Sequence, residues 1–319
     1  MPRSVTTRAP GKVNLALHVG GLGDDGYHPV ATIYQAVDIY EQVTAIGAPS
    51  GSGITIKIAA PANYANISAI PTDHRNIAYR AAALIANRIG IPPDIVLIIE
   101  KAVPVAGGMA GGSADAAATL VACNELWGGG FSITELLALA AELGSDVPFA
   151  LLGGTALGIG RGEILTPIAT QGTFLWAFGL SDIGLATPTV YRKFDELGAG
   201  VNQHHPAASA SLNNSPNSAV NQELLLALAT GDAAQIGAHL SNGLQPAALA
   251  LRPELCRTLE IARSQHALGA IVSGSGPTIA ALAGTAQHAQ RIADAWQQAG
   301  VVTNTIVGKA PAHGARIAS

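Results

Sequence analysis

Hydrophobic and polar residues alternate near the start of the chain with the two-residue period of a β-strand. Apolar side chains occupy every second position of residues 12–19, and Lys12 and Asn14 project together from the opposite face. Residues 23–26 have turn chemistry, and residues 30–43 predict the returning strand. Lys12 and Asn14 are therefore either a solvated strand face or parts of a site, and the pattern alone favours neither.

The rest of the chain has the patterns of further helices and strands. Helices are predicted at residues 73–89, 116–127, 132–144, 222–229, 233–240, 253–266 and 286–299, and from residue 187 onward. Strands are predicted at residues 95–100, 153–160, 174–180 and 303–307, and as a pair around a glycine turn within 271–282. The pattern divides the chain into a first unit that closes near residue 160 and a second unit from residue 161 to residue 319.

Three segments carry the signals of loops or tails. Residues 48–53 predict a hairpin loop, and the tail from Lys309 predicts disorder. Residues 198–221 are rich in alanine, serine, asparagine and proline, which predicts a long flexible insertion. The pair His204-His205 inside this insertion lacks partners at the spacing of a metal site.

Composition narrows the class of protein. The chain has 319 residues, of which 49% are hydrophobic and 12% charged, and its formal net charge is −4. A packed globular protein is expected, without the basic excess of a nucleic-acid surface. No stretch reaches the ~18 apolar residues of a membrane span, and the N-terminus lacks a signal-peptide core, so a cytoplasmic location is expected. Cys123 and Cys256 are predicted to be buried thiols in a reducing compartment.

The segment from Pro104 to Asp115 places four glycines between a strand-like run and an alanine-rich helical run. Glycines permit positive φ and the close approach of a ligand, and the N-terminus of the following helix attracts an anion. The loop matches neither a Walker A sequence nor the G-x-G-x-x-G of a dinucleotide fold. A phosphate site is favoured over an empty tight turn. Ser113 and Asp115 suit helix caps, and the Ser113 hydroxyl also suits contact with Mg²⁺ or a phosphate oxygen.

Two further motifs each allow a structural and a functional interpretation. Tyr27-His28 begins the returning strand and could stack on a base with hydrogen bonds to its edge, but these residues alone favour ordinary surface packing. Asp146 is a lone carboxylate in apolar sequence, two residues before Pro148. It either caps the short helix that Pro148 opens or acts as a tuned catalytic carboxylate, and both interpretations stay open on these residues alone.

Together these motifs resemble those of the GHMP kinases over about residues 9–307. The matching segments are Ala-Pro-Gly-Lys-Val-Asn-Leu at 9–15, Asp-Gly-Tyr-His at 25–28, the glycine loop at 104–117, Gly-Ser-Asp-Val-Pro-Phe at 144–149 and Ser-Gly-Ser-Gly-Pro-Thr at 273–278. Ala110 stands where the family usually has glycine. Because left-handed φ is costly for alanine, the loop is expected to follow a slightly different path.

The resemblance implies a two-domain α+β fold with the active site in the cleft between the domains. Residues 1–160 are expected as a ribosomal-protein-like domain and residues 161–319 as a ferredoxin-like domain. It also implies the cofactors ATP and Mg²⁺, and transfer of the γ-phosphate to the 2-hydroxyl of 4-diphosphocytidyl-2-C-methyl-D-erythritol in the non-mevalonate isoprenoid pathway. A monomer or weak homodimer is expected, acting on this small molecule. The alternatives are another small-alcohol kinase of the family and a non-catalytic nucleotide binder.

The resemblance further implies residue roles. Asp146 is expected as the catalytic base and Lys12 as the cation that keeps it ionised. The expected substrate residues are Asn14, Tyr27, His28, Asp146, Pro188, Tyr191, Gly274 and Ser275. Of these, His28 is expected to read the cytosine edge, and Tyr191 to stack the base against Tyr27. The expected ATP residues are Asn76, Lys101, Pro104, Gly107, Gly108, Met109, Ala110, Gly111, Gly112 and Ser113.

Overall fold

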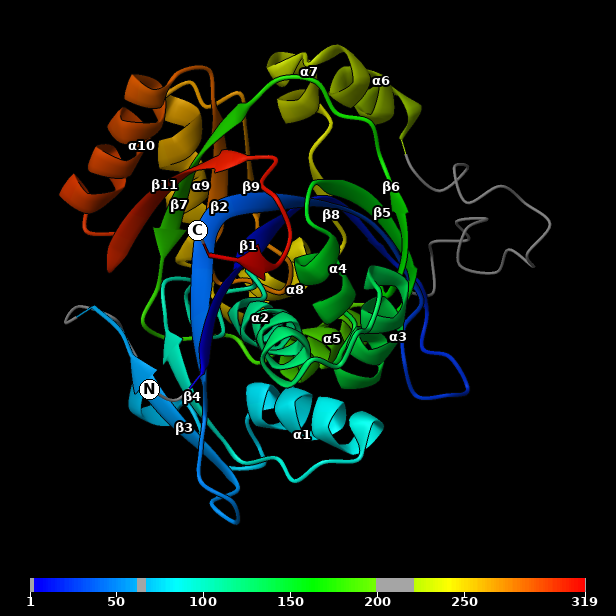
Figure 1. Ribbon diagram of the computed structural model, residues 1–319. Helices are drawn as coiled ribbons and strands as arrows, with labels where there is room; N and C mark the ends of the chain where they lie inside the picture. Colours follow the sequence, from blue (N-terminus) through cyan, green and yellow to red (C-terminus); the bar gives the residue numbers. More distant parts are fainter. Residues whose placement is uncertain (1–2, 62–66, 199–220, 319) are drawn as a thin grey trace.

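The strands of the chain form two sheets. The computed structural model describes residues 3–61, 67–198 and 221–318, so the predicted insertion lies outside the described residues apart from its two end positions. One sheet has eight strands with the order β12-β1-β2-β4-β3, and β5, β6 and β8 attach to it; the other has four strands with the order β11-β7-β10-β9 (Figure 1). The two sheets with their helices form a mixed helix-and-sheet architecture.

The strands at residues 95–100 and 174–180 have the predicted bounds, whereas those at residues 54–59, 164–167, 241–242 and 316–317 were not predicted. The first sheet contains β1 (Ser4–Val19), β2 (Val30–Gly47), β3 (Ile54–Ala59), β4 (Ile95–Glu100), β5 (Thr155–Gly160), β6 (Ile164–Pro167), β8 (Ser241–Asn242) and β12 (Arg316–Ile317). The second contains β7 (Phe174–Leu180), β9 (Gly269–Val272), β10 (Ile279–Ala283) and β11 (Asn304–Ala310). The predicted glycine-turn hairpin is confirmed, because β9 and β10 pair antiparallel.

The helices cover the sheets and connect them. They are α1 (Ile77–Ile89), α2 (Gly111–Trp127), α3 (Ile133–Leu143), α4 (Val147–Leu152), α5 (Thr187–Glu196), α6 (Gln222–Thr230), α7 (Ala233–Ala238), α8 (Gln245–Leu251), α9 (Leu255–Ser264) and α10 (Ala286–Gln298), with a 3₁₀ turn at Ile67–Ala69. Ser132 caps α3 through a full capping box with Glu135, as its position predicts. The short helix α8 was missed by the pattern.

The hairpin of β1 and β2 is the longest strand pair and runs through the centre of the first sheet. β1 pairs with β2 along its length, with β12 at Thr7 and Arg8, and with β8 at Ala16 and Leu17. Lys12 and Asn14 are 6% and 2% exposed, which excludes the interpretation of these two residues as a solvent-facing pair. Register shifts between Pro10 and Gly11 and between Asn14 and Ala16 interrupt the pairing on either side of them. Such irregularities in a strand change the direction of its side chains, and they are common next to active sites.

Helix α2 is the central helix of the first domain. It contacts β1, β2, α1, α3 and α4, and most of its residues are buried. Its run of alanines allows this, because small side chains let neighbouring elements approach from all sides. The helix begins at Gly111, five residues before the predicted start at Ala116. The glycine loop therefore leads directly into a rigid, buried helix.

The two sheets share one hydrophobic core. Val13 and Leu15 of β1 pack in the same cluster as Phe174 and Trp176 of β7 and Leu282 of β10. On the far side of the small sheet, α9 and α10 cover the strands (Figure 1). Buried apolar surface therefore joins the two halves of the chain.

Three predictions about connections and cysteines are wrong. Residues 48–53 do not close a hairpin, because β2 pairs with β4 and β3 runs parallel to β4. The tail is ordered: β12 pairs antiparallel with β1, and Ala312 donates its N–H to the carbonyl oxygen of Ala36. Cys123 is buried as expected, whereas Cys256 is exposed. The first two errors share a cause, since strand partners distant in sequence are invisible to local patterns.

The chain does not divide cleanly at residue 160. β6 follows that residue but still pairs with β5 in the first sheet, and the second sheet starts at Phe174. β8 and β12 return from the second half to pair with β1. The C-terminal half thus completes the N-terminal sheet. No helix in the described part of the chain is long and apolar enough to cross a membrane.

Replacing Gly108 tests the contact between the glycine loop and the second domain. Gly108 has a φ of 76°, and a Cβ there would overlap the carbonyl oxygen of Ser273. We expect Gly108→Ala to lower the free energy of unfolding in urea by about 3 kcal/mol or more, since strain and overlap add.

Gly51 provides the matched control. Its φ is 85°, yet nothing lies within 4 Å of an added Cβ. Gly51→Ala therefore carries only the strain of a left-handed alanine, about 1–2 kcal/mol. Equal losses in the two variants would show that the loop can move away from Ser273 at no cost.

Candidate active site

A cleft with a volume of about 1020 Å³ lies where β1, β2, the glycine loop and α5 meet. Most predicted site residues line it, and they come from segments far apart in sequence. They are Lys12, Asn14, Tyr27, His28, Pro104, Gly107, Gly108, Ala110, Gly111, Gly112, Ser113, Asp146, Pro188, Tyr191, Gly274 and Ser275. Asn76, Lys101 and Met109 do not line it.

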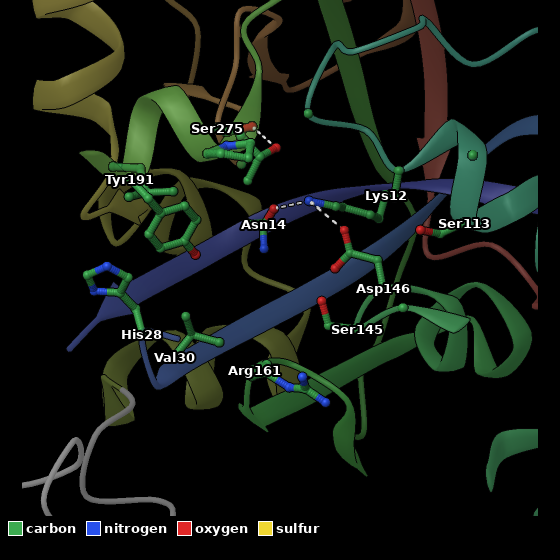
Figure 2. A pocket seen from close by; sticks show the side chains of 18 of the residues that line it. Lys12, Asn14, His28, Val30, Ser113, Ser145, Asp146, Arg161, Tyr191 and Ser275 are labelled. Carbon is green, nitrogen blue, oxygen red and sulfur yellow. Dashed lines mark hydrogen bonds and ion pairs between the residues drawn. The ribbon is translucent and has the colours of Figure 1, made fainter. Parts of the chain in front are cut away.

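Lys12 places a buried ammonium in the wall of the cleft. Its Nζ donates to Asn14 Oδ1 at 2.6 Å and lies 3.9 Å from Asp146 Oδ2. Figure 2 shows these three side chains pointing toward one another. Asn14 Nδ2 donates to Thr32 Oγ1 at 2.8 Å, which turns the amide oxygen toward Lys12. Burial lowers the pKa of Lys12, and the negative charge of Asp146 opposes that change.

Asp146 does not cap the helix that follows it. It precedes α4, but its backbone is helical, with φ −87° and ψ −10°, and its side chain makes no capping bond. The carboxylate instead accepts a hydrogen bond from Tyr34 Oη at 2.9 Å on one oxygen, while the other faces Lys12. The capping interpretation of Asp146 is therefore wrong. Its carboxylate is held by two groups at the floor of the cleft.

Tyr34 is a site residue that is absent from the predicted set. Burial and the charge of Asp146 raise the pKa of its hydroxyl well above 10, so it stays a donor. Its ring stacks on Phe149 with centroids 4.8 Å apart. A Cβ at Gly158 or Gly162 would overlap the Tyr34 side chain, so these glycines leave space for it. In the sequence Tyr34 is one more position in an apolar strand, with no signal of its own.

The glycine loop presents backbone N–H groups at the start of α2. Gly108 and Ala110 adopt left-handed φ of 76° and 61°. Ala110 thus takes the conformation that glycine would take, at the energetic cost expected for alanine. Because α2 begins at Gly111 and no side chain caps it, the predicted caps Ser113 and Asp115 are wrong. The free N–H groups and the helix dipole favour an anion there.

The three predicted residues that do not line the cleft make contacts within the protein around it. The Asn76 side chain accepts a hydrogen bond from the Ala78 N–H and caps α1. Met109 buries its side chain in the shared core, while its carbonyl accepts the Lys12 N–H at 3.1 Å. Lys101 is buried in an ion cluster behind the glycine loop. None of the three side chains lines the cleft, and their contact with ATP stays a prediction.

The ion cluster consists of Lys101, Glu41 and Asp115. Lys101 Nζ lies 2.6 Å from Asp115 Oδ2 and 2.8 Å from Glu41 Oε1. Glu41 also accepts the N–H groups of Ala102 and Val103, both at 3.1 Å. In this cluster one cation faces two carboxyl groups. Burial is the main cause that raises the pKa of Glu41 to about 8, and the charge of Asp115 is the second. The cluster ties the root of the loop to β2 and α2.

The opposite end of the cleft is aromatic. The rings of His28 and Tyr191 have centroids 5.0 Å apart, and Arg161 lies over the Tyr27 ring at 4.8 Å. Tyr27 is 53% exposed, so its ring is accessible to a ligand. Arg161 is a second residue missing from the predicted site, because it lies in the turn directly after β5 and belongs to no motif. This end of the cleft suits a flat, aromatic group.

The second domain closes the cleft through Gly274 and Ser275. Ser275 Oγ lies 3.1 Å from Thr187 Oγ1, which links this turn to the start of α5. Asn242 donates to the carbonyl oxygen of Gly274 at 2.7 Å. The predicted turn between β9 and β10 therefore forms one wall of the site as well as a hairpin.

Known proteins with similar sequences identify the family. Residues 76–154 match the GHMP kinases N terminal domain, and residues 224–302 match the GHMP kinases C terminal family. A 4-diphosphocytidyl-2-C-methyl-D-erythritol kinase of Thermobifida fusca is 47% identical over 99% of this chain and 99% of its own. One of Streptomyces avermitilis is 48% identical over 98% and 99%. The chain belongs to this family of GHMP kinases. It is an ATP-dependent kinase, as the motifs predict.

Solved structures confirm the predicted α+β fold of the kinase. A crystal structure of a 4-(cytidine 5'-diphospho)-2C-methyl-D-erythritol kinase has 29% identity and a TM-score of 0.71, covering 96% of this chain and 99% of that one. A mevalonate kinase of L. major, solved with R-mevalonate, has a TM-score of 0.75 at 18% identity, covering 98% and 100%. The second likeness concerns the fold alone.

The ion cluster behind the loop predicts a pH-dependent stability. With its pKa near 8, Glu41 binds a proton in the folded state that it loses in the unfolded chain above its ordinary pKa of 4.5. The folded state binds more protons, so this contribution to stability is complete below about pH 4.5 and is lost as pH rises through about 8. We expect Glu41→Gln to flatten the decline in free energy of unfolding over that range.

Urea unfolding at several pH values measures this effect. Glu100→Gln is the matched control, because Glu100 is exposed at the end of β4. Its profile is expected to parallel that of the wild type. A Glu41→Gln profile that also runs parallel to the wild type would contradict a protonated Glu41.

Proposed function

We propose that the kinase transfers the ATP γ-phosphate to the 2-hydroxyl of 4-diphosphocytidyl-2-C-methyl-D-erythritol, with Asp146 as base and Lys12 as its electrostatic partner. The observation that carries this proposal is the Asp146 carboxylate, held between Lys12 and Tyr34 in the same cleft as the glycine loop. The names of the full-length relatives support the choice of substrate. A nucleotide binder without chemistry would have no use for this carboxylate.

The chemistry follows from these positions. Asp146 takes the proton of the substrate hydroxyl while the hydroxyl oxygen attacks the γ-phosphorus. The bond from that phosphorus to the leaving oxygen of ADP breaks. Charge in this loose transition state spreads over the equatorial phosphoryl oxygens. The Lys12 ammonium and the N–H groups at the start of α2 stabilise that charge without reorganising. Proximity and electrostatics therefore supply most of the rate, and the base adds about 10²–10⁴-fold.

Lys12 is suited to act on both Asp146 and the phosphoryl group. Its link to Asn14 leaves its other donor hydrogens free to face the carboxylate and the incoming phosphate. Burial lowers its pKa, but the adjacent carboxylate favours the charged form. Tyr34 donates to the remaining side of the carboxylate, so an oxygen of Asp146 keeps a fixed orientation toward the substrate hydroxyl.

The residues of the cleft fit Mg²⁺ bound mainly through phosphates. The described part of the chain has no group of three or more His, Cys, Asp or Glu that could hold a metal. The Ser113 hydroxyl lines the cleft in the first turn of α2 and is the protein ligand that we propose. Mg²⁺ commonly keeps water and substrate phosphates as its other ligands, where it neutralises phosphate charge.

The aromatic end of the cleft is proposed to bind the cytosine. His28, Tyr27, Tyr191 and Pro188 line it together. Burial, with a contribution from Asp146, raises the pKa of Tyr191 to about 12, so its hydroxyl stays neutral beside the base. The nucleotide base of ATP is proposed to lie toward α1 and α3, where Ile77 and Arg80 face the same cleft.

ADP release with four alcohols tests the substrate. The purified kinase is assayed with ATP, Mg²⁺ and either 4-diphosphocytidyl-2-C-methyl-D-erythritol, mevalonate, homoserine or galactose. Turnover confined to the cytidine compound is expected. Turnover of another alcohol instead would show that the proposed substrate is wrong, whereas the proposed phosphate site would still stand.

Replacing Asp146 tests the base. We expect Asp146→Asn to lower kcat by about 10²–10⁴-fold, because the amide cannot take the proton. ATP affinity measured by calorimetry is expected to stay nearly unchanged, since the loop amides hold the phosphates. Glu260→Gln, on an exposed carboxylate of α9, is the control. Near wild-type turnover in Asp146→Asn would eliminate this role.

Replacing Tyr34 separates orientation from chemistry. We expect Tyr34→Phe to lower kcat by about 10-fold, the value of one hydrogen bond to a charged group, with little change in KM. Tyr79→Phe is the control, since Tyr79 packs against the core of the first domain outside the cleft. Equal kcat values for the wild type and Tyr34→Phe would show that Lys12 alone orients Asp146.

A further inference from the structure

The C-terminal tail packs against the helix that follows Asp146. After β11 the chain runs beside α4 on its way to β12 (Figure 1). The Ala315 N–H donates to the carbonyl oxygens of Ala150 at 3.0 Å and Leu151 at 3.2 Å, both in the last turn of α4. Carbonyl groups at the end of a helix lack partners within the helix, and here the tail supplies a donor. The tail therefore caps the helix that begins directly after the proposed base.

The backbones of the tail and of α4 are in direct contact. Gly153, at the end of α4, forms an antiparallel bridge with His313. A Cβ at Gly153 would overlap the backbone of Gly314, and a Cβ at Gly314 would overlap the carbonyl oxygen of Leu151. Glycine at both positions permits this approach, because it has no Cβ.

The same tail also contacts the strand that carries Tyr34. Ala312 donates its N–H to the carbonyl oxygen of Ala36 on β2 at 2.9 Å, and its own carbonyl oxygen accepts the N–H of Gly154 at 2.7 Å. The Ala312 side chain is buried in a small hydrophobic cluster with Tyr34 and Phe149. Tyr34 belongs to β2 and Phe149 to α4. The tail therefore bridges the two elements that bring the Tyr34 hydroxyl to the proposed base.

Arg316 links the tail to β2 through a third set of contacts. Its Nη1 donates to the carbonyl oxygens of His313 and Gly314, both at 3.1 Å, and its Nη2 donates to Tyr40 Oη at 3.0 Å. The guanidinium groups of Arg316 and Arg8 both lie over the Tyr40 ring, with Cζ 4.9 Å and 5.0 Å from its centroid. A cation over an aromatic face is attracted to it. One side chain thus fixes both the turn of the tail and its place on the strand.

We propose that the C-terminal tail, residues 311–318, is a positioning segment that keeps the Tyr34 hydroxyl within hydrogen-bond reach of Asp146. This inference rests on the proposed function, because it takes Asp146 as the base. Tyr34 and Asp146 lie on different elements, and a shift of about 1 Å between them would break their 2.9 Å hydrogen bond. The tail does not line the cleft. Its loss is therefore expected to lower kcat and to leave substrate binding nearly unchanged.

Replacing Arg316 in the full chain releases the tail. We expect Arg316→Met to lower kcat by about five-fold, with KM for ATP and for the alcohol changed by less than about two-fold. Gly314→Ala, which pushes the tail away from Leu151, is expected to act in the same direction. The matched controls are Arg257→Met, on an exposed arginine of α9, and Gly284→Ala, where nothing lies within 4 Å of an added Cβ.

A double-mutant cycle separates positioning from a loss of folded protein. In Tyr34→Phe the hydrogen bond to Asp146 is already absent, so adding Arg316→Met is expected to lower kcat further by less than about two-fold. A variant that merely destabilises the fold would lower activity by the same factor in both backgrounds. Hydrogen exchange of the Gly154 N–H, which donates to Ala312, measures whether the tail has been released. Faster exchange is expected in both tail variants.

The outcomes separate this inference from the proposed function. Faster exchange at Gly154 with a wild-type kcat overturns the inference, and so does an equal loss of kcat with and without the Tyr34 hydroxyl. Unchanged exchange in both tail variants also overturns it, since Arg316 and Gly314 would then not hold the tail. The assay uses whichever of the four alcohols the wild type turns over, so a wrong substrate leaves the test intact. A wrong base is recognised separately, by near wild-type turnover in Asp146→Asn.

Discussion

The buried ammonium of Lys12 is the constraint around which the site is built. A cation inside a sheet is costly unless polar groups surround it. Here Asn14 accepts from it at 2.6 Å, Asp146 lies at 3.9 Å, and Thr32 fixes the amide of Asn14. The same arrangement that makes burial tolerable also orients the carboxylate proposed as base. The contacts of Lys12 with Asn14 and Asp146 therefore serve both the stability of the fold and the proposed chemistry.

A second buried lysine has a different task. Lys101 pairs with Glu41 and Asp115 behind the glycine loop, and Glu41 holds the N–H groups at the start of that loop. It carries no group toward the cleft. Both lysines are nearly inaccessible, and they differ in what surrounds them. Lys12 faces a cavity, whereas Lys101 faces only protein.

The glycine loop depends on both domains. Gly108 packs against the turn after β9, and Ser273 Oγ donates to the Gly108 carbonyl at 3.2 Å. The loop backbone is thus held by the second domain on one side and by α2 on the other. Ala110 adopts a left-handed φ within this frame. Alanine disfavours a left-handed φ, but the packing on both sides of the loop holds Ala110 in this conformation.

Local patterns in the sequence were enough to predict many of the helices and strands and the glycine loop before α2. The strand at Ile95–Glu100 and the cap at Ser132 could be predicted because periodicity and capping involve neighbouring residues. The contact of Tyr34 with Asp146, the pairing of Lys101 with Glu41 and Asp115, and the pairing of the tail with β1 follow only from the tertiary structure. These contacts join residues far apart in the chain, and no local pattern encodes which distant partner a side chain will meet.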